Sequence, residues 1–285
     1  MASDEPNLPD EEDLPEGEEG LEEALPPDLE VLEGLADLEE DDVDGEAPAK
    51  PEEPEEKILF AKHKAPSEKA IREALDWAFE GEDVEARFLE RCTEHALLLY
   101  GAVRRMNLTK IIEPREVAAK HYLDCWRATR LLPLLGKRVL DIGTGGGFPG
   151  IPIALAEENA HVHLIDADEN KAAFVAECIE KMKIANASSS AGRGEEHLLR
   201  NKFDVCIMRD MSSVRENVRL LRKVRHQFYD LVMLKGSSWS REVRAGEREA
   251  ERLGFRLDTI LEHELPGEMG GRAVLVYRAP GGRGR

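Results

Sequence analysis

Aromatic residues make up only 5% of this 285-residue chain. So few rings argue against an extended platform on which several nucleic-acid bases could stack. Nowhere do 18 apolar residues run together, and the first residues carry neither the basic nor the apolar region of an export signal. Neither membrane spanning nor export is therefore indicated, and we expect a cytoplasmic protein.

Cysteine is scarce as well. The four cysteines, Cys92, Cys125, Cys178 and Cys206, lie far apart and form no CxxC pair. That spacing argues against a zinc site and against a disulfide framework. We expect reduced, buried cysteines and no bound metal.

Basic residues are almost missing from the first 56 residues. This segment holds 25 of the 59 acidic residues and a single basic one, Lys50. Residues 57–285 hold 38 basic and 34 acidic residues and so carry a charge of +4, although the whole chain carries −20. The acidic total describes the N-terminal segment and hides a mildly basic body, so nucleic acid stays open as a partner.

The acidic segment also has little with which to fold. It contains frequent prolines and no aromatic residue, so it cannot bury enough apolar surface to offset the entropy of ordering. We expect residues 1–66 to be a disordered tail. Its leucines between 21 and 38 leave two alternatives open, a solubilising tail or a short helix that binds an unknown partner.

In the remaining chain, the spacing of apolar residues changes once, from helical to strand-like. Apolar residues recur at helical spacing from Ser67, a plausible N-cap, through a helix opened by Pro114, and predict a helical cap over 67–136. Strand-like runs then alternate with helical stretches, which predicts a parallel sheet over 137–285. The runs are 138–142, 161–165, 203–208, 229–234, 255–261 and 273–277. Because no helix separates the last two runs, we expect them to pair as an antiparallel hairpin. A parallel α/β sheet that ends in such a hairpin is the Rossmann-like architecture of class I S-adenosylmethionine-dependent methyltransferases.

A glycine-rich loop, DIGTGGGFPG at 141–150, follows the first strand. It contains a literal GxGxxG, and Asp166 ends the next strand, so a dinucleotide-binding dehydrogenase stays an alternative, as does a tight turn that binds nothing. Asp141 suits a cationic ligand, and two prolines remove NH groups that a pyrophosphate would use. These features favour S-adenosylmethionine. No GxxxxGK[ST] occurs, which excludes an ATP P-loop.

Single motifs do not identify the atom that accepts the methyl group. The chain has neither the Cys–Pro nucleophile used on pyrimidine carbons nor the Asp/Asn-Pro-Pro-aromatic motif used on exocyclic amines. Guanine N7 carries a lone pair and no proton, so positioning alone can suffice there. The absence of an acid–base set is compatible with that acceptor.

Several separated blocks resemble one family, the bacterial 16S ribosomal RNA guanine-N7 methyltransferases called RsmG or GidB. The blocks are MNLTKI (106–111), KHYLDC (120–125), DIGTGGGFPGIPIA (141–154), LIDADENKAAFV (164–175), GRGEE (192–196), IMRDMSS (207–213), MLKG (233–236) and GRAVLVY (271–277). The resemblance covers roughly 83–278. It implies methylation of a guanine in the 530 loop, with 16S rRNA or the small ribosomal subunit as partner and a monomeric enzyme.

The resemblance also implies site residues. The cofactor site would be built by Asp141, Gly143, Gly145, Gly147, Phe148, Asp166, Gly194, Glu195 and Arg209. The substrate would be positioned by Arg209, Lys235, Asn107, His121 and Asp124, with Thr109 in the same N-terminal signature. No residue is assigned as a catalytic acid or base. A flipped guanine could stack on Phe148, Tyr122 or Trp126.

One departure weakens the acceptor assignment. Asp210 follows Arg209 where the family has alanine, which places a carboxylate beside the expected guanine entrance. Two alternatives therefore stay open. One is a methyltransferase of this fold with a small molecule or protein as acceptor, and the other is a non-catalytic ribosome-assembly factor that binds RNA.

Overall fold

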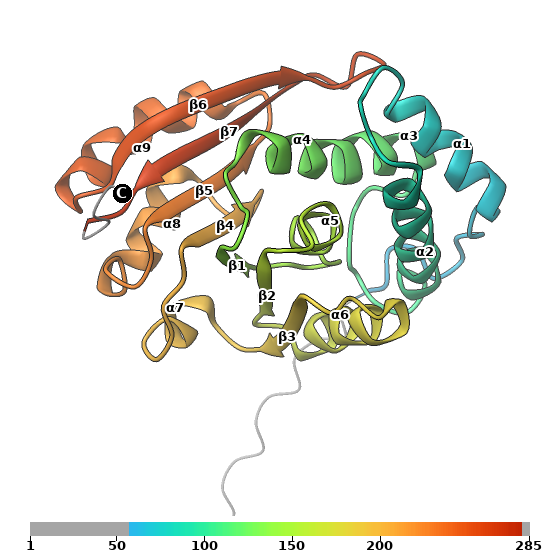
Figure 1. Ribbon diagram of the computed structural model, residues 1–285, viewed down its shortest axis with the longest axis horizontal. Helices are drawn as coiled ribbons and strands as arrows, with labels where there is room; N and C mark the ends of the chain where they lie inside the picture. Colours follow the sequence, from blue (N-terminus) through green and yellow to red (C-terminus); the bar gives the residue numbers. More distant parts are fainter. Residues whose placement is uncertain (1–56, 281–285) are drawn as a thin grey trace, which may run out of the picture. The chain divides into compact units, whose positions relative to one another are not determined.

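Seven strands form one mixed sheet in the computed structural model, which describes residues 57–280 (Figure 1). The strands are β1 Arg138–Ile142, β2 His161–Asp166, β3 Ala187–Ala191, β4 Val205–Arg209, β5 Asp230–Lys235, β6 Arg256–Glu264 and β7 Gly271–Arg278. Their order is β3-β2-β1-β4-β5-β7-β6, with β1 to β5 parallel and β7 antiparallel to both neighbours. The predicted parallel sheet with a terminal antiparallel hairpin is confirmed.

Strand β3 was missing from the sequence prediction. Its sequence is ASSSA, which lacks the β-branched and aromatic residues that mark a strand. The strand exists because its backbone pairs with β2 along its whole length, with Val162 opposite Ala187 and Asp166 opposite Ala191. Pairing at the sheet edge thus overrides a weak local preference.

Helices precede the sheet and alternate with its parallel strands, as predicted. They are α1 Glu68–Ala78, α2 Ala86–Ala102, α3 Pro114–Val117, the π-helical turn η1 Ala118–Leu123, α4 Asp124–Leu131, α5 Gly150–Ala156, α6 Glu169–Met182, α7 Gly194–His197, α8 Val214–Leu220, the 3₁₀ turn η2 Leu221–Lys223 and α9 Trp239–Arg252. Ser67 caps α1 by accepting from Ala70 N, and Pro114 opens α3, both as expected. The helix predicted to begin at Pro114 is interrupted by η1.

Two hydrophobic clusters cover the two faces of the sheet. Alternate residues of one strand enter different clusters, as Leu231 and Met233 of β5 pack with α8 and α9, and Val232 and Leu234 pack with the helices before α7. This alternation is what a strand buried on both faces requires. Helices α1 to α4 share the larger cluster with α5 and α6. A separate cap over 67–136 stays a prediction.

Both ends of the chain extend beyond the described residues. The predicted disorder of the acidic tail concerns mainly residues 1–56, which lie outside the described range. Residues 59–62 form turns, and the side chain of Asn107, which follows α2, accepts from Leu59 N (2.9 Å) and donates to Lys57 O (3.2 Å). All four cysteines are buried and free, as expected. None of the helices between 57 and 280 is long and apolar enough to cross a membrane.

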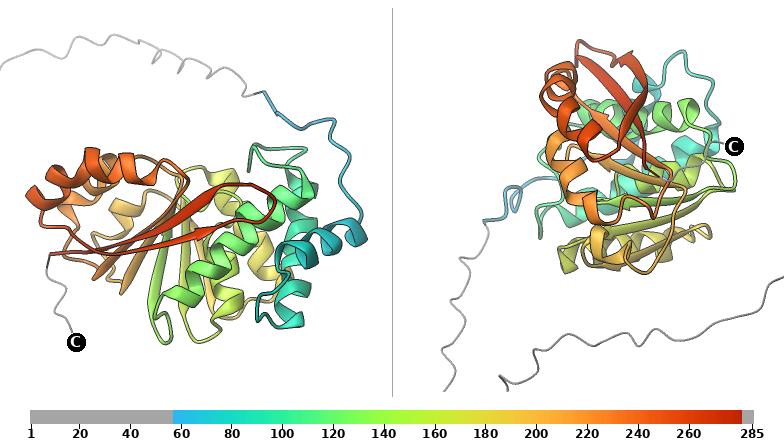
Figure 2. Two further views of the ribbon diagram at one scale, coloured as in Figure 1. Left: turned by 90° about the horizontal axis from the view of Figure 1, so that it is seen from above. Right: turned by 90° about the vertical axis from the view of Figure 1, so that its left-hand side faces the viewer.

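The β6–β7 hairpin reaches back across the molecule to the first helices (Figure 2). The backbone carbonyl of Glu264 accepts from Arg127 of α4 (2.5 Å), and a Cβ on Gly267 would lie 3.0 Å from the Trp77 ring of α1. The hairpin therefore ties the C-terminal strands to the helices that precede β1.

Candidate active site

The glycine-rich loop lies at the carboxyl end of β1, beside the point where the strand order reverses between β1 and β4. The backbone N–H groups of Gly143 and Thr144 donate to Ile165 O at 2.9 and 3.2 Å. Gly147 has a φ of +91°, and a Cβ there would lie 2.6 Å from Ile151 Cδ1. Crevices at such a reversal are the usual ligand sites of open parallel sheets.

Asp141 of β1 holds the glycine-rich loop through a hydrogen bond to its last residue. Its carboxylate is fully buried, and Oδ2 accepts from Gly150 N (2.8 Å) at the first turn of α5. Burial raises the pKa of Asp141 to about 7, although Thr144 and the Gly150 amide oppose the shift. This acid therefore braces the joint between β1 and α5, which differs from the direct contact with a cationic ligand that the sequence suggested.

Asp166 ends β2 and holds the opposite side of the loop. Its Oδ2 accepts from Gly145 N (2.8 Å), and its Oδ1 accepts from Asp168 N (3.0 Å). A carboxylate can accept about four hydrogen bonds, so roughly two acceptor positions are free of these backbone donors. The half-buried carboxylate thus fits a ligand that offers adjacent hydroxyl groups, such as a ribose.

Gly194 and Glu195 open the short helix α7 near the same strand ends. Gly192 N donates to Asp166 O (2.8 Å), which fixes this segment against β2. A Cβ on Gly194 would lie 2.6 Å from Ile142 Cγ2, so only glycine permits this close approach to β1. Gly194 therefore packs against the end of β1, directly before the glycine loop, and the adenine role of Gly194 and Glu195 stays a prediction.

Arg209, the last residue of β4, extends toward η1. Its Nη1 donates to Lys120 O (2.9 Å) and to Nδ1 of His121 (2.8 Å), and its guanidinium carbon lies 5.3 Å from the centre of the Phe148 ring. Its Nε is buried and has no hydrogen-bond partner in the part of the chain that the structure describes. An unpaired buried donor is costly, and an acceptor on a bound ligand would satisfy it.

His121 holds the arginine in place. A guanidinium nitrogen only donates, so Nδ1 of His121 accepts and the ring proton lies on Nε2, 2.9 Å from Thr109 Oγ1. Burial and then the charge of Arg209 lower the pKa of His121 well below 6.5, so the ring is neutral. It stacks on Phe148 at 4.6 Å between ring centres. With both nitrogens engaged, His121 positions Arg209 and has no free nitrogen for acid–base work.

Three predicted substrate residues are held by other partners. Asn107 holds residues 57–59, as described above. Asp124 is buried and contacts the hairpin, with Oδ1 3.0 Å from His263 Nε2 and Oδ2 3.8 Å from Arg272 Nε. Lys235 is also buried, forms an ion pair with Glu242 (2.9 Å), and donates to Ser212 O. None of these three is hydrogen-bonded to the group formed by Thr109, His121, Phe148 and Arg209.

The rings expected to stack on a guanine are not available for it. Tyr122 is completely buried, and Trp126 and Phe148 are 7% and 4% exposed. Phe148 is enclosed by His95, His121 and Tyr122. The expectation that Tyr122 or Trp126 offers a stacking face is therefore wrong, because the helices pack both rings into the core.

His95 was missed by the sequence reasoning. It lies on the buried face of α2, its Nδ1 is 3.0 Å from the Tyr122 hydroxyl, and its Nε2 is 3.3 Å from the Cβ position of Gly147. Burial lowers its pKa to about 3, so the ring is neutral. Its helical spacing could have marked it as buried, but only the folded structure places it behind the glycine loop.

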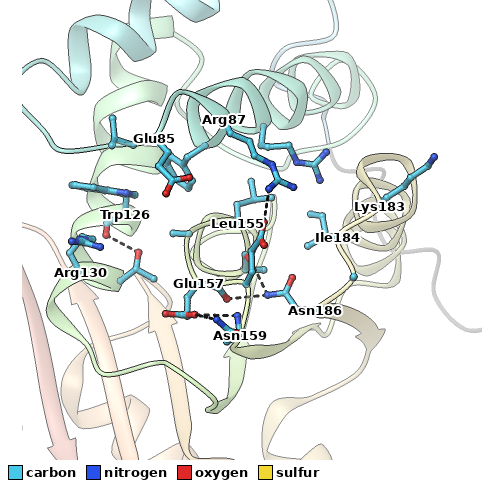
Figure 3. Close-up of a pocket in the computed structure, with 18 of the residues that line it drawn as sticks. Glu85, Arg87, Trp126, Arg130, Leu155, Glu157, Asn159, Lys183, Ile184 and Asn186 are labelled. Carbon is cyan, nitrogen blue, oxygen red and sulfur yellow. Dashed lines mark hydrogen bonds and ion pairs between the residues drawn. The ribbon is translucent and has the colours of Figure 1, made fainter.

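A cavity of about 690 Å³ lies away from this site, at the other end of α5 (Figure 3). Neither the glycine loop nor Asp166 lines it. Its charged side chains include four basic and four acidic residues, and one pair, Arg87 and Glu158, is in contact at 3.4 Å. This mixed and partly self-neutralised lining gives no preference for one ligand charge.

The topology and the site together define a class I S-adenosylmethionine-dependent methyltransferase. A glycine loop follows β1, a carboxylate ends β2, and an antiparallel hairpin ends the sheet. Among solved structures, the chain is similar to a SAM-dependent methyltransferase from Aquifex aeolicus, with 17% identity, a TM-score of 0.46, and 61% of this chain and 97% of that chain covered.

Sequence comparison gives the family. The family model described as rRNA small subunit methyltransferase G (GidB) matches residues 89–266. A relative named ribosomal RNA small subunit methyltransferase G from Desulforamulus reducens is 33% identical over 185 residues, which cover 61% of this chain and 75% of the relative. Another of that name, from Carboxydothermus hydrogenoformans, is 26% identical over 70% of this chain and 86% of its own length. The chain belongs to the GidB family of rRNA small subunit methyltransferase G.

Proposed function

We propose that this protein transfers a methyl group from S-adenosylmethionine to N7 of a guanine in the 530 loop of 16S rRNA. The observation that carries the proposal is Arg209, a half-buried guanidinium held beside the glycine loop, whose Nε is buried and unpaired within the described residues. Membership of the GidB family supports small-subunit rRNA as the substrate. We also propose that the protein acts in the cytoplasm and as a monomer.

In this proposal two sets of groups hold the cofactor. Asp166 accepts the ribose hydroxyls, and the backbone of Gly143, Gly145 and Gly147 allows the close approach that the positive φ values permit. Gly194 and Glu195 flank the adenine. Asp141 and Phe148 act indirectly, because the first braces the loop and the second supports Arg209 and His121.

Methylation of guanine N7 does not require a catalytic acid or base. S-adenosylmethionine supplies an electrophilic methyl on a sulfonium, and guanine N7 supplies a lone pair without losing a proton first. The protein has to orient the base in line and exclude water. Arg209 suits this task because its charge is fixed and its guanidinium is held by two acceptors, whereas neutral His121 has both nitrogens engaged.

Two experiments test the proposal. N7-methylguanosine should be mapped on rRNA from cells with and without the protein, and loss at one guanine of the 530 loop is the expected result. An unchanged map would reject this acceptor and favour another methyl acceptor in the same fold. Calorimetry with S-adenosylmethionine separates both cases from a non-catalytic assembly factor, for which no binding heat is expected.

A further inference from the structure

A row of arginines lies on the outward side of α9. Arg241, Arg244 and Arg248 are exposed and follow one another at helical spacing. At 3.6 residues per turn they lie opposite Gly246 and Ala250, the buried residues of this helix. Within residues 57–280, no carboxylate lies within ion-pair distance of these three side chains.

None of the acidic residues of α9 pairs with the row. Glu249 lies between two arginines, 2.8 Å from Arg219 of α8 and 2.7 Å from Arg252, while Glu242 contacts Lys235 at 2.9 Å. By helical periodicity, Glu247 and Glu251 lie on the flank away from α8. Glu247 and Glu251 therefore border the arginine row on one side, at the i+3 positions of Arg244 and Arg248, but neither forms an ion pair with it.

Helix α8 packs against the side of α9 opposite the row and carries a further exposed arginine. A Cβ on Gly246 would lie 2.9 Å from Val214 Cγ1 and 3.1 Å from Arg215 N, so glycine lets the two helices pack closely (Figure 1). Arg215 of α8 is exposed, with no acidic partner between residues 57 and 280. We call Arg215, Arg241, Arg244 and Arg248 the α8–α9 arginine surface.

Both helices begin at the edge of the sheet that carries the candidate active site. Helix α8 starts after the short loop that follows Arg209, and α9 starts after Lys235 at the end of β5. The buried ammonium of Lys235 joins these segments, because it contacts Ser212 O of the loop and the Glu242 carboxylate of α9. The position of the surface is thus fixed relative to Arg209.

We propose that the α8–α9 arginine surface binds the phosphate backbone of the RNA next to the guanine held at Arg209. The inference rests on the proposed function for the identity of the RNA. Arginine forks match phosphate oxygens, and exposed guanidinium groups without acidic partners have no ion pair to break before they bind phosphate. Each phosphate neutralised by such a side chain releases counterions, so binding weakens as salt rises.

The test compares two variants with the same change of charge. R241Q/R244Q/R248Q removes three positive charges from the surface. K62Q/K64Q/K69Q removes three from exposed lysines at the start of α1, at the opposite side of the molecule (Figure 1). Both full-length variants are titrated with an unmethylated 16S rRNA fragment containing the 530 loop at several salt concentrations. Calorimetry with S-adenosylmethionine checks that each variant retains its site.

We expect the arginine variant to bind the fragment at least about tenfold more weakly near 0.15 M salt, and its slope of log affinity against log salt to be smaller by about 2. The lysine variant should match the wild type. Equal slopes and affinities in both variants would overturn the proposal. Tighter RNA binding by the arginine variant would also overturn it and would indicate that the acidic residues 1–56 use the surface. Because the readout is binding, an enzyme that fails to methylate rRNA would contradict the proposed function separately.

Discussion

The two halves of the candidate active site are built by different means. The half around the glycine loop is made of backbone groups at adjacent strand ends, with Asp141 and Asp166 fixing the loop through Gly150 N and Gly145 N. The half around Arg209 is made of side chains, which come from three segments distant in sequence. A backbone site depends on glycine and on register, whereas a side-chain site depends on tertiary packing.

The loop half should therefore be the more sensitive to a single added methyl group. Gly147→Ala places a Cβ 2.6 Å from Ile151 Cδ1 at a φ of +91°, so we expect the free energy of unfolding to fall by about 2–4 kcal/mol. Gly101→Ala is the control, because a Cβ there meets nothing within 4 Å in helix α2, and it should stabilise by about 0.5–1 kcal/mol. Denaturant unfolding measures both. Equal effects would show that the loop tolerates a side chain.

The brace under the loop should make stability depend on pH. The pKa of Asp141 is about 7 in the folded protein against an ordinary 3.8, so its contribution is fully present below 3.8 and lost as pH rises through about 7. Between pH 5 and pH 8, wild type should lose about 2–3 kcal/mol relative to Asp141→Asn. Unfolding of both proteins across this range gives the difference, in which the other titrating groups cancel. A difference that does not change with pH would contradict the shift.

The half around the glycine loop was largely predictable from sequence, and the half around Arg209 was not. Asp141, the loop glycines and Asp166 lie next to strands that hydrophobic runs had already located, so their meeting at one edge follows from a parallel sheet. The contact of Arg209 with His121 joins residues 88 apart, through a π-helical turn that periodicity does not reveal. His95 behind Gly147 is likewise visible only in the folded chain.

Asp166→Ala tests whether the loop half holds the cofactor. Loss of this carboxylate removes the proposed ribose acceptors and frees Gly145 N, so affinity for S-adenosylmethionine should fall by about 1–3 kcal/mol. Asp168→Ala is a useful control, because Asp168 caps α6 and should affect stability more than affinity. Calorimetry measures both affinities. An unchanged affinity for Asp166→Ala would reject the ribose assignment.

Arg209→Ala tests the side-chain half. It leaves His121 Nδ1 and Lys120 O without their donor and removes the charge proposed to orient the base. We expect methylation of rRNA to fall about 10- to 100-fold, with less than about a threefold change in cofactor affinity. Arg209→Lys should recover part of the activity, because one ammonium can still reach an acceptor. Equal losses of methylation and cofactor binding would place Arg209 in the cofactor site alone.

Asn107→Ala should have the smallest effect of these substitutions. It tests whether Asn107 belongs to the half of the site around Arg209. Family resemblance predicts a substrate role for Asn107, but its amide bonds Leu59 N and Lys57 O in a solvent-exposed turn. Exposed hydrogen bonds are worth little, so the free energy of unfolding should fall by less than about 1 kcal/mol, with methylation within about twofold of wild type. Asn107→Asp, which keeps the acceptor for Leu59 N, should lose less stability still. A large loss of methylation at unchanged stability and cofactor affinity would instead give Asn107 a direct part in holding the RNA. The half of the site around Arg209 would then extend to the segment at residues 57–59.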